Sequence, residues 1–319
     1  MTRQKQTGLA MVIVIWVLSL MTIMAGSFAL TMRRETVVIS AVKDNAEALA
    51  IAETGFAIAN QMLTLIDRSK RWKADGSIYK IFYKEAEIRV RLFSEQGKID
   101  INQADEKLLT SMMSSTSLEI DEQQSLVSAI LDWRDQDDLV HINGAEKDEY
   151  EEAGLSYQPA NKNFNVIEEL RMVLGVNDAI FETLRPLVTV YSEQPDVDLK
   201  IAPIEVQFAL ANPDALSWED FLKQRLDNIE FQSDNTNFQA TGNTGANQQT
   251  NGNNNVYTII SQARLIADTE ASIKITIRQT TNAKALVPYQ VLEYRQLYQG
   301  LSLFSDEMEQ FVVTEEDES

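Results

Sequence analysis

The chain of 319 residues contains no cysteine and a single histidine, His141. The absence of cysteine excludes disulfide bonds, thiolate metal sites and thiol catalysis. One histidine leaves little material for a histidine-based zinc site or a Ser-His-Asp triad. Basic residues are also scarce: the chain has 28 Lys and Arg against 48 Asp and Glu, and its net charge is −20. This balance argues against nucleic-acid binding, which needs a basic face, and suits a domain that recruits cations.

Charge is absent from Leu9 to Met32, a run of 24 residues. A helix of this length spans roughly 36 Å, enough to cross a bilayer core of about 30 Å. The apolar part of an ordinary signal peptide is shorter, about 7–15 residues. Arg3 and Lys5 precede the run, so the positive-inside rule places the N-terminus in the cytoplasm. The sequence predicts a single-pass anchor with the bulk of the chain outside the cytoplasm.

The helix is expected to continue beyond the membrane. Residues 35–66 contain no proline and one glycine, Gly55, and Ala46, Leu49, Ala57 and Ile58 recur at helical spacing. We therefore predict one long helix, apolar in its first half and amphipathic in its second. From this helix alone, a plain anchor with a stalk remains an alternative.

The rest of the chain reads as strands, a helical block and strands again. The pattern in Glu87–Leu92 alternates polar and apolar residues, and 233–255 is an Asn/Gln/Thr/Gly tract that we expect to form a mobile surface loop. The expected strands lie in 77–93, 257–266, 271–279 and 286–298, and the expected helices in 104–113, 121–133, 166–174, 179–184, 203–210 and 218–229. This order predicts an α+β fold with a helical insertion between the strands of a small, mostly antiparallel sheet.

The densest chemistry is the stretch LDWRDQDDLVHINGAEKDEYEEAGLSY, residues 131–157. Hard oxygen ligands near a glycine turn are what Ca²⁺ requires. Asp135, Asp137 and Glu146 match the first, third and twelfth places of an EF-hand loop, but Leu139 and Val140 break the match. Two interpretations of this stretch stay open: a different arrangement of carboxylates that binds calcium, and an acidic loop that is only solvated. Carboxylate pairs also serve glycoside hydrolysis, for which no sugar cleft is indicated.

Two other residues of this stretch receive structural interpretations. His141 is expected to be a loop surface residue, because Ca²⁺ prefers oxygen ligands, and Trp133 is expected in the core. The segments INQA (101–104) and ELRMVLGV (169–176) are similar to helix-hairpin-helix modules. Their turns lack clusters of Lys and Arg, so we interpret them as shared architecture without DNA binding.

The motifs together resemble the general secretion pathway protein K family, the large minor pseudopilins of type II secretion. They are the basic leader ending in Gly8, then LAMVIVIWVLSLMTIMAGSFA, INQADEKLL, AILDWRDQDDLVHINGAEKDEYEEAGLSYQPANKNF, VIEELRMVLGV and PYQVLEYRQLY. The resemblance implies a pilin-like long N-terminal helix on a small antiparallel sheet, with a large SAM-like helical insertion. The implied divisions are a leader 1–8, a transmembrane part 9–32, the rest of the helix with the first strands 33–98, SAM-like parts 99–195 and 200–235, the loop 233–255, closing strands 256–300 and an acidic tail 301–319.

The resemblance also implies processing and metal binding. A prepilin peptidase would cut between Gly8 and Leu9 and methylate the new N-terminus. Ile13 stands where most pilin-like subunits carry a glutamate that pairs with a neighbour, which fits a subunit at a filament tip, because a buried carboxylate without a partner is costly. The ligands carried over for calcium are Asp135, Asp137, Asp138 and Glu146, followed by Asp132 and Asp148.

The function implied is that of a non-enzymatic subunit. It would cap an inner-membrane pseudopilus that exports folded proteins across the outer membrane, with minor pseudopilins of the I and J types as partners. A minor pilin-like subunit of a type IV pilus is the main alternative. A membrane-anchored periplasmic enzyme with a carboxylate site is a second, for which the residues give no support.

Overall fold

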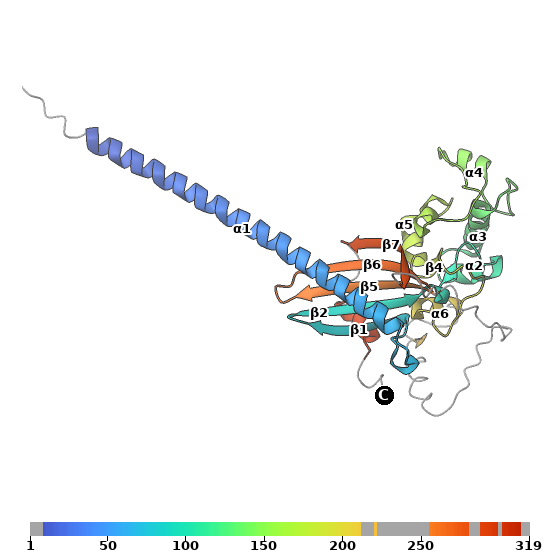
Figure 1. The fold of residues 1–319 in the computed structure, drawn as a ribbon. Helices are drawn as coiled ribbons and strands as arrows, with labels where there is room; N and C mark the ends of the chain where they lie inside the picture. Colours follow the sequence, from blue (N-terminus) through green and yellow to red (C-terminus); the bar gives the residue numbers. More distant parts are fainter. Residues whose placement is uncertain (1–8, 212–219, 222–254, 281–287, 299–301, 314–319) are drawn as a thin grey trace, which may run out of the picture.

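The computed structural model describes residues 9–211, 220–221, 255–280, 288–298 and 302–313. Helix α1 (Leu9–Leu63) has 55 residues, and its N-terminal half projects away from the rest of the molecule (Figure 1). Among the described residues it is the one helix long and apolar enough to cross a membrane. The predicted long helix is confirmed. It ends three residues before Ile66, where the Thr64 amide donates to the Gln61 carbonyl at 3.1 Å and the chain turns.

The C-terminal part of α1 packs across one face of an antiparallel sheet (Figure 1). The described strands are β1 (Asp75–Tyr83), β2 (Ala86–Ser94), β5 (Val256–Leu265), β6 (Glu270–Gln279) and β7 (Tyr289–Leu297), in the order β1-β2-β5-β6-β7. Alternate side chains of β2, β5 and β6 point at the helix and form a buried core. Gly55 permits the close approach, because a Cβ there would lie 2.3 Å from Ser261 Oγ.

The chain between β2 and β5 forms a helical insertion with its own core, as the element order predicted (Figure 1). Trp133, Tyr150 and Phe181 are among its largest buried side chains. Its described elements are the 3₁₀ turn η2 (Glu95–Gly97), β3 (Ile99–Asp100), α2 (Glu106–Met113), α3 (Ile120–Arg134), α4 (Lys147–Glu152), the 3₁₀ helix η3 (Ile167–Met172), α5 (Asp178–Leu184), β4 (Val188–Thr189) and α6 (Ile204–Leu210). The expected α+β architecture is therefore confirmed.

Several element boundaries differ from the predicted ones. Helix α2 begins at Glu106 and not at Ala104, because the Asp105 carboxylate caps it by accepting from the Leu108 amide at 2.8 Å. The helix predicted at 166–174 is the 3₁₀ helix η3. Helix α4 and the short parallel pair β3–β4 were not predicted. Most of the predicted helix 218–229 and of the tract 233–255 lies outside the described residues.

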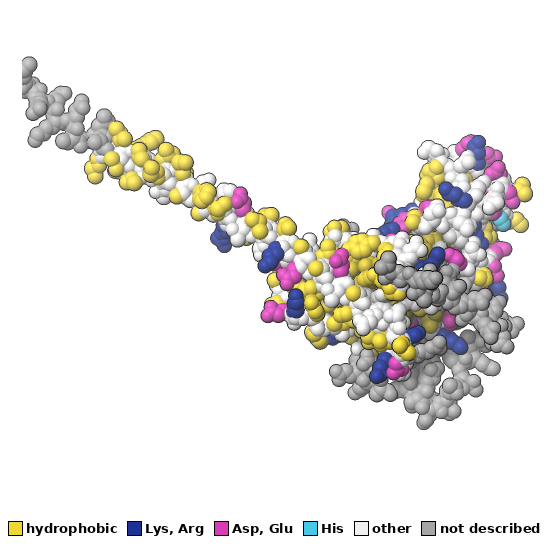
Figure 2. Space-filling view, in the orientation of Figure 1, with side chains coloured by type: hydrophobic (Ala, Val, Ile, Leu, Met, Phe, Trp, Pro, Cys, Tyr) yellow, Lys and Arg dark blue, Asp and Glu magenta, His cyan; other side chains and the backbone are white. Residues whose placement is uncertain are grey.

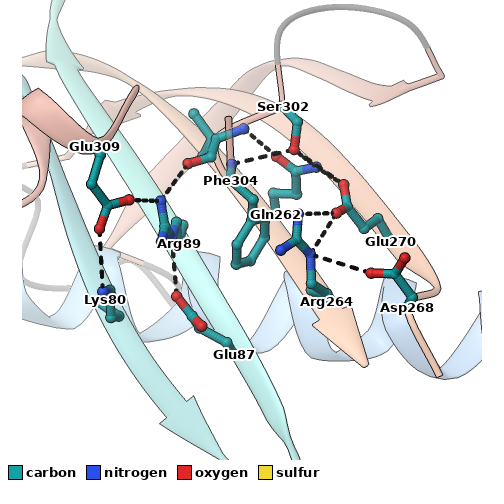
Figure 3. Close-up of polar contacts among 11 residues, drawn as sticks. Lys80, Glu87, Arg89, Gln262, Arg264, Asp268, Glu270, Ser302, Phe304 and Glu309 are labelled. Carbon is teal, nitrogen blue, oxygen red and sulfur yellow. Dashed lines mark hydrogen bonds and ion pairs between the residues drawn. The ribbon is translucent and has the colours of Figure 1, made fainter. Parts of the chain in front are cut away.

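Residues Ser302–Val313, here called the C-terminal strap, cross the face of the sheet opposite α1 (Figure 3). The sequence assigned this segment to an acidic tail, but Leu303 is buried and the Val313 amide donates to the Ile78 carbonyl at 2.9 Å. Arg89 of β2 holds the strap by donating to Glu309 at 2.7 Å and to the Leu303 carbonyl at 2.9 Å. The last residues of the predicted acidic tail, 314–319, lie outside the described residues.

Candidate functional site: a carboxylate cluster

The acidic stretch folds into a loop between the end of α3 and the start of α4, at the end of the helical insertion far from the N-terminus of α1 (Figure 1). Asp132 lies in the last turn of α3, Asp135 follows as its C-cap, and Glu146 is the N-cap of α4. The Gly144 amide donates to the His141 carbonyl at 2.8 Å, and Asn143 adopts φ 61°. The Asn-Gly turn therefore folds the chain back and brings the two ends of the loop together.

Asp132 is fully buried and organises this loop through both carboxylate oxygens. Its Oδ1 accepts from the His141 amide at 3.1 Å and contacts His141 Nδ1, while its Oδ2 accepts from the Ala145 amide at 2.7 Å. A Cβ on Gly144 would lie 2.0 Å from Asp132 Oδ2. Glycine is therefore required for steric reasons, so that the backbone can approach the carboxylate.

Within the described part of the chain, three buried side-chain oxygens around the loop have no hydrogen-bond partner: Asp135 Oδ1, Glu146 Oε1 and Asn161 Oδ1. Buried oxygens without partners are rare, because each loses its bonds to water without replacement. Asn161 is tied to the same cluster, since its amide nitrogen donates to Asp138 Oδ1 at 2.8 Å and to the Asp137 carbonyl at 3.2 Å. Asn161 was not predicted as a site residue, and no pattern in the sequence indicates its left-handed φ of 47°.

Burial and neighbouring negative charges raise the pKa values of two of the carboxylates, Asp135 and Glu146. Burial, followed by the charges of Asp132, Asp135, Asp138 and Asp137, raises the pKa of Glu146 from 4.5 to about 7. Burial and then the charges of Asp137 and Asp132 raise the pKa of Asp135. The hydrogen bond to Asp132 is the main cause that raises the pKa of His141. A site in which negative charges are crowded and partly desolvated favours a bound cation or a proton.

The predicted residues take different positions in this site. Asp132, Asp135 and His141 offer ligand atoms within 4.8 Å of one another. His141 was predicted as a plain loop surface residue, which is incomplete: its side chain is 46% exposed, yet it contacts the buried Asp132 and lies 3.7 Å from Asp135 Oδ2. The predicted core position of Trp133 is confirmed.

The predicted ligands Asp137, Asp138 and Asp148 are exposed. Asp137 Oδ1 accepts from the Leu139 amide at 2.9 Å, and Asp138 is bound to Asn161. Asp148 is exposed in the first turn of α4. The assignment of all six predicted residues as metal ligands stays a prediction. Gly8 lies outside the described residues, whereas Leu9 is the first residue of α1.

Comparisons with known proteins agree with the resemblance. The family model of the type II secretion system protein K matches residues 90–193. Two proteins named type II secretion system protein K are similar: one from Pectobacterium carotovorum subsp. carotovorum is 36% identical over 70 residues (22% of this chain, 21% of that protein), and one from Klebsiella pneumoniae is 21% identical over 211 residues (60% and 64%). The predicted resemblance to the protein K family is thus confirmed, and the matches span less than two thirds of these relatives' lengths.

The chain is also similar to a solved chain from a GspK-GspI-GspJ complex of the enterotoxigenic Escherichia coli type 2 secretion system. That likeness covers 84% of this chain and 99% of the other, with 15% sequence identity and a TM-score of 0.49.

Proposed function

We propose that this chain is a minor pseudopilin that helps to assemble and cap the tip of a type II secretion pseudopilus. The proposal is carried by the position of segment 90–193, which matches the family model. Most of this segment forms the helical insertion within the sheet. The sheet packs on a long helix that begins with an apolar run. A minor pilin of a type IV pilus would share the helix and the sheet but has no need of this insertion.

The same proposal extends to the membrane and to the partners. The apolar half of α1 would anchor the subunit in the inner membrane, with the rest in the periplasm, and would later pack in the filament. Ile13 lies in the exposed apolar half of α1 and cannot form the ion pair that a glutamate at this position makes with a neighbouring subunit. The I- and J-type minor pseudopilins would bind through the long helices and the sheet domains.

Copurification tests the proposal. The full chain should be expressed with the I- and J-type pseudopilins and the prepilin peptidase of its own gene neighbourhood, and extracted from membranes in detergent. We expect a stable complex with both partners, and mass spectrometry should find a methylated Leu9 at the N-terminus. A chain that keeps Met1 and binds neither partner would refute the pseudopilin assignment.

We also propose that the carboxylate cluster binds Ca²⁺. The donor set fits this ion, because it consists of hard oxygens, several of which are buried without partners, on a loop that no disulfide closes. Asp135, Glu146 and Asn161 would supply oxygens directly, with Asp137 and Asp138 beside them. Asp132 is already bonded through both oxygens, so its first role is to shape the loop.

Calorimetric titration of the full chain with Ca²⁺, after removal of metal by a chelator, tests the metal proposal. Asp135→Asn should weaken binding by tenfold or more. Glu152→Gln is the matched control, because it removes an exposed carboxylate at the end of the neighbouring helix α4. Heat of binding that is absent in the unmodified chain, or equal losses in both variants, would leave the loop as an ordinary solvated acidic surface.

A further inference from the structure

Two hairpin turns of the sheet carry large exposed apolar side chains. The β1–β2 turn follows Phe82 and Tyr83, and the β5–β6 turn begins at Ile266. Phe82 is 75% exposed and Ile266 is 77% exposed. The sheet and the helical insertion are here together called the head. Both turns lie at the end of the sheet that faces the projecting N-terminal half of α1 (Figure 1).

Phe82 lies on the face of the sheet that carries the C-terminal strap, and Ile266 follows the end of β5 in the neighbouring turn. Phe82 is paired across the strands with Glu87, which is paired with Arg264, so these side chains project to the same side as the C-terminal strap. The strap reaches Lys80 through Glu309 at 3.7 Å, and Arg264 through the ring of Phe304. Phe82 and Ile266 are each two residues closer to the turns than these contacts, so the strap leaves them uncovered.

Between the arginine pair and the head, helix α1 carries exposed apolar side chains next to charged ones such as Lys43 and Asp44. Val37, Val38 and Val42 follow Arg33 and Arg34 and are each more than half exposed. A stalk that holds a head away from a membrane in water would be expected to be polar. Apolar side chains at this level instead favour a helix that lies partly within the interfacial region of the bilayer.

The dimensions require a tilted helix. Ala48 is the first buried residue of α1 beyond position 10, and about 24 Å of helix separates it from Met32, the end of the uncharged run. An upright helix would therefore keep the hairpin turns clear of the headgroups. Membrane helices tilt by up to about 40°, and a tilt toward the sheet brings the turns down toward the lipid surface.

We propose that Phe82, Tyr83 and Ile266 form a lipid contact that rests the head on the bilayer through which α1 passes. The proposal rests on the proposed membrane anchoring of this chain and adds a second, peripheral contact to it. Aromatic side chains favour the membrane–water interface, and the Lys84 amine, which lies over the Tyr83 ring, can reach toward phosphate groups. The exposed Glu85 and Asp268 in the same turns argue against selection for anionic lipids, so the contact is apolar in character.

Single cysteines test this contact cleanly, because the natural chain contains none. The full chain is reconstituted in lipid nanodiscs, labelled with a fluorophore at Phe82→Cys or Ile266→Cys, and quenched by lipids that carry a nitroxide at the headgroup. Thr31→Cys in the anchor is the positive control, and Glu151→Cys on α4, in the helical insertion, is the distant control. We expect quenching at positions 82 and 266 at least twofold greater than at position 151.

The outcomes separate this inference from the proposed function. Strong quenching at position 31 with quenching at 82 and 266 no greater than at 151 would overturn the lipid contact and leave the anchor intact. Absence of quenching at position 31 would overturn the anchor and the contact together. A second variant controls for an effect of the label on the contact, because it carries the fluorophore at Lys84→Cys and keeps the apolar side chains. If these side chains hold the contact, adding Phe82→Ser and Ile266→Ser to this variant should lower the quenching by at least half.

Discussion

Glu146→Gln should change stability in opposite directions with and without calcium. Glu146 is 6% exposed, and its pKa is raised from 4.5 to about 7 by burial and four neighbouring carboxylates. At about 1.4 kcal/mol per pKa unit, this corresponds to about 3 kcal/mol against the ionised form in the metal-free protein. Glutamine keeps the shape of the side chain without the charge. In the presence of a chelator at pH 8, the variant should therefore be more stable than the natural chain by up to about 3 kcal/mol.

The pH dependence has the sign expected of a carboxylate whose pKa is raised by folding. Between pH 4.5 and about 7 the folded protein keeps a proton on Glu146 that the unfolded chain has released. The stability of the metal-free natural chain should therefore fall as the pH rises through this window. The variant carries no titrating group at this position and should lose less stability over the same range.

With calcium bound, the charge of Glu146 becomes favourable and the comparison reverses. Loss of a ligand should weaken calcium binding, and a ligand that binds only the folded state stabilises it in proportion to the logarithm of its concentration over Kd. Urea unfolding of the full chain in detergent, followed by tryptophan fluorescence, measures both conditions. If Glu146→Gln has the same sign with chelator and with excess Ca²⁺, the proposed electrostatic account of the site is wrong.

Two further substitutions test the packing of the sheet domain. Gly55→Ala should lower the free energy of unfolding by about 1–3 kcal/mol, because the added methyl group would lie 2.3 Å from Ser261 Oγ; Ala57→Ser on the exposed side of the same helix should be near neutral in the same urea titration. Arg89→Gln should cost about 2 kcal/mol and release the C-terminal strap, because Arg89 donates to a strap carboxylate and to a strap carbonyl. Hydrogen–deuterium exchange should then speed up across residues 302–313, and unchanged protection there would contradict the role of Arg89.

The long helix and the sheet were predictable because their signals are periodic and local. The uncharged run, the helical spacing beyond it and the alternation in β2 each follow from which face of an element is buried. Boundaries were less predictable, since a single hydrogen bond decides them, as at Asp105. The C-terminal strap was missed because its acidic composition suggests a free tail. Its attachment depends on Arg89, more than 200 residues earlier in the chain.

The carboxylates of the site were predictable from their density and from the Asn-Gly turn. Which of them are used in hydrogen bonds and which keep a free oxygen was not predictable. Asp132 and Asp135 lie only three positions apart in the sequence. In the structure the first is saturated by hydrogen bonds from the loop, and the second keeps an oxygen without a partner. That difference arises from where α3 ends and where the chain returns at Ala145. Asn161 escaped prediction for the same reason, because it approaches from a different segment.

The position of the cluster also limits what calcium can control. The helical insertion and the sheet have separate hydrophobic cores, joined across their boundary by polar contacts such as Arg91–Glu205 at 2.8 Å and Arg278–Glu193 at 2.7 Å. Distant sites without shared partners usually contribute additively to stability. Calcium should therefore stabilise the insertion much more than the sheet and α1. A partner that binds the sheet domain and the long helix should then keep its affinity when calcium is removed, provided that the insertion stays folded.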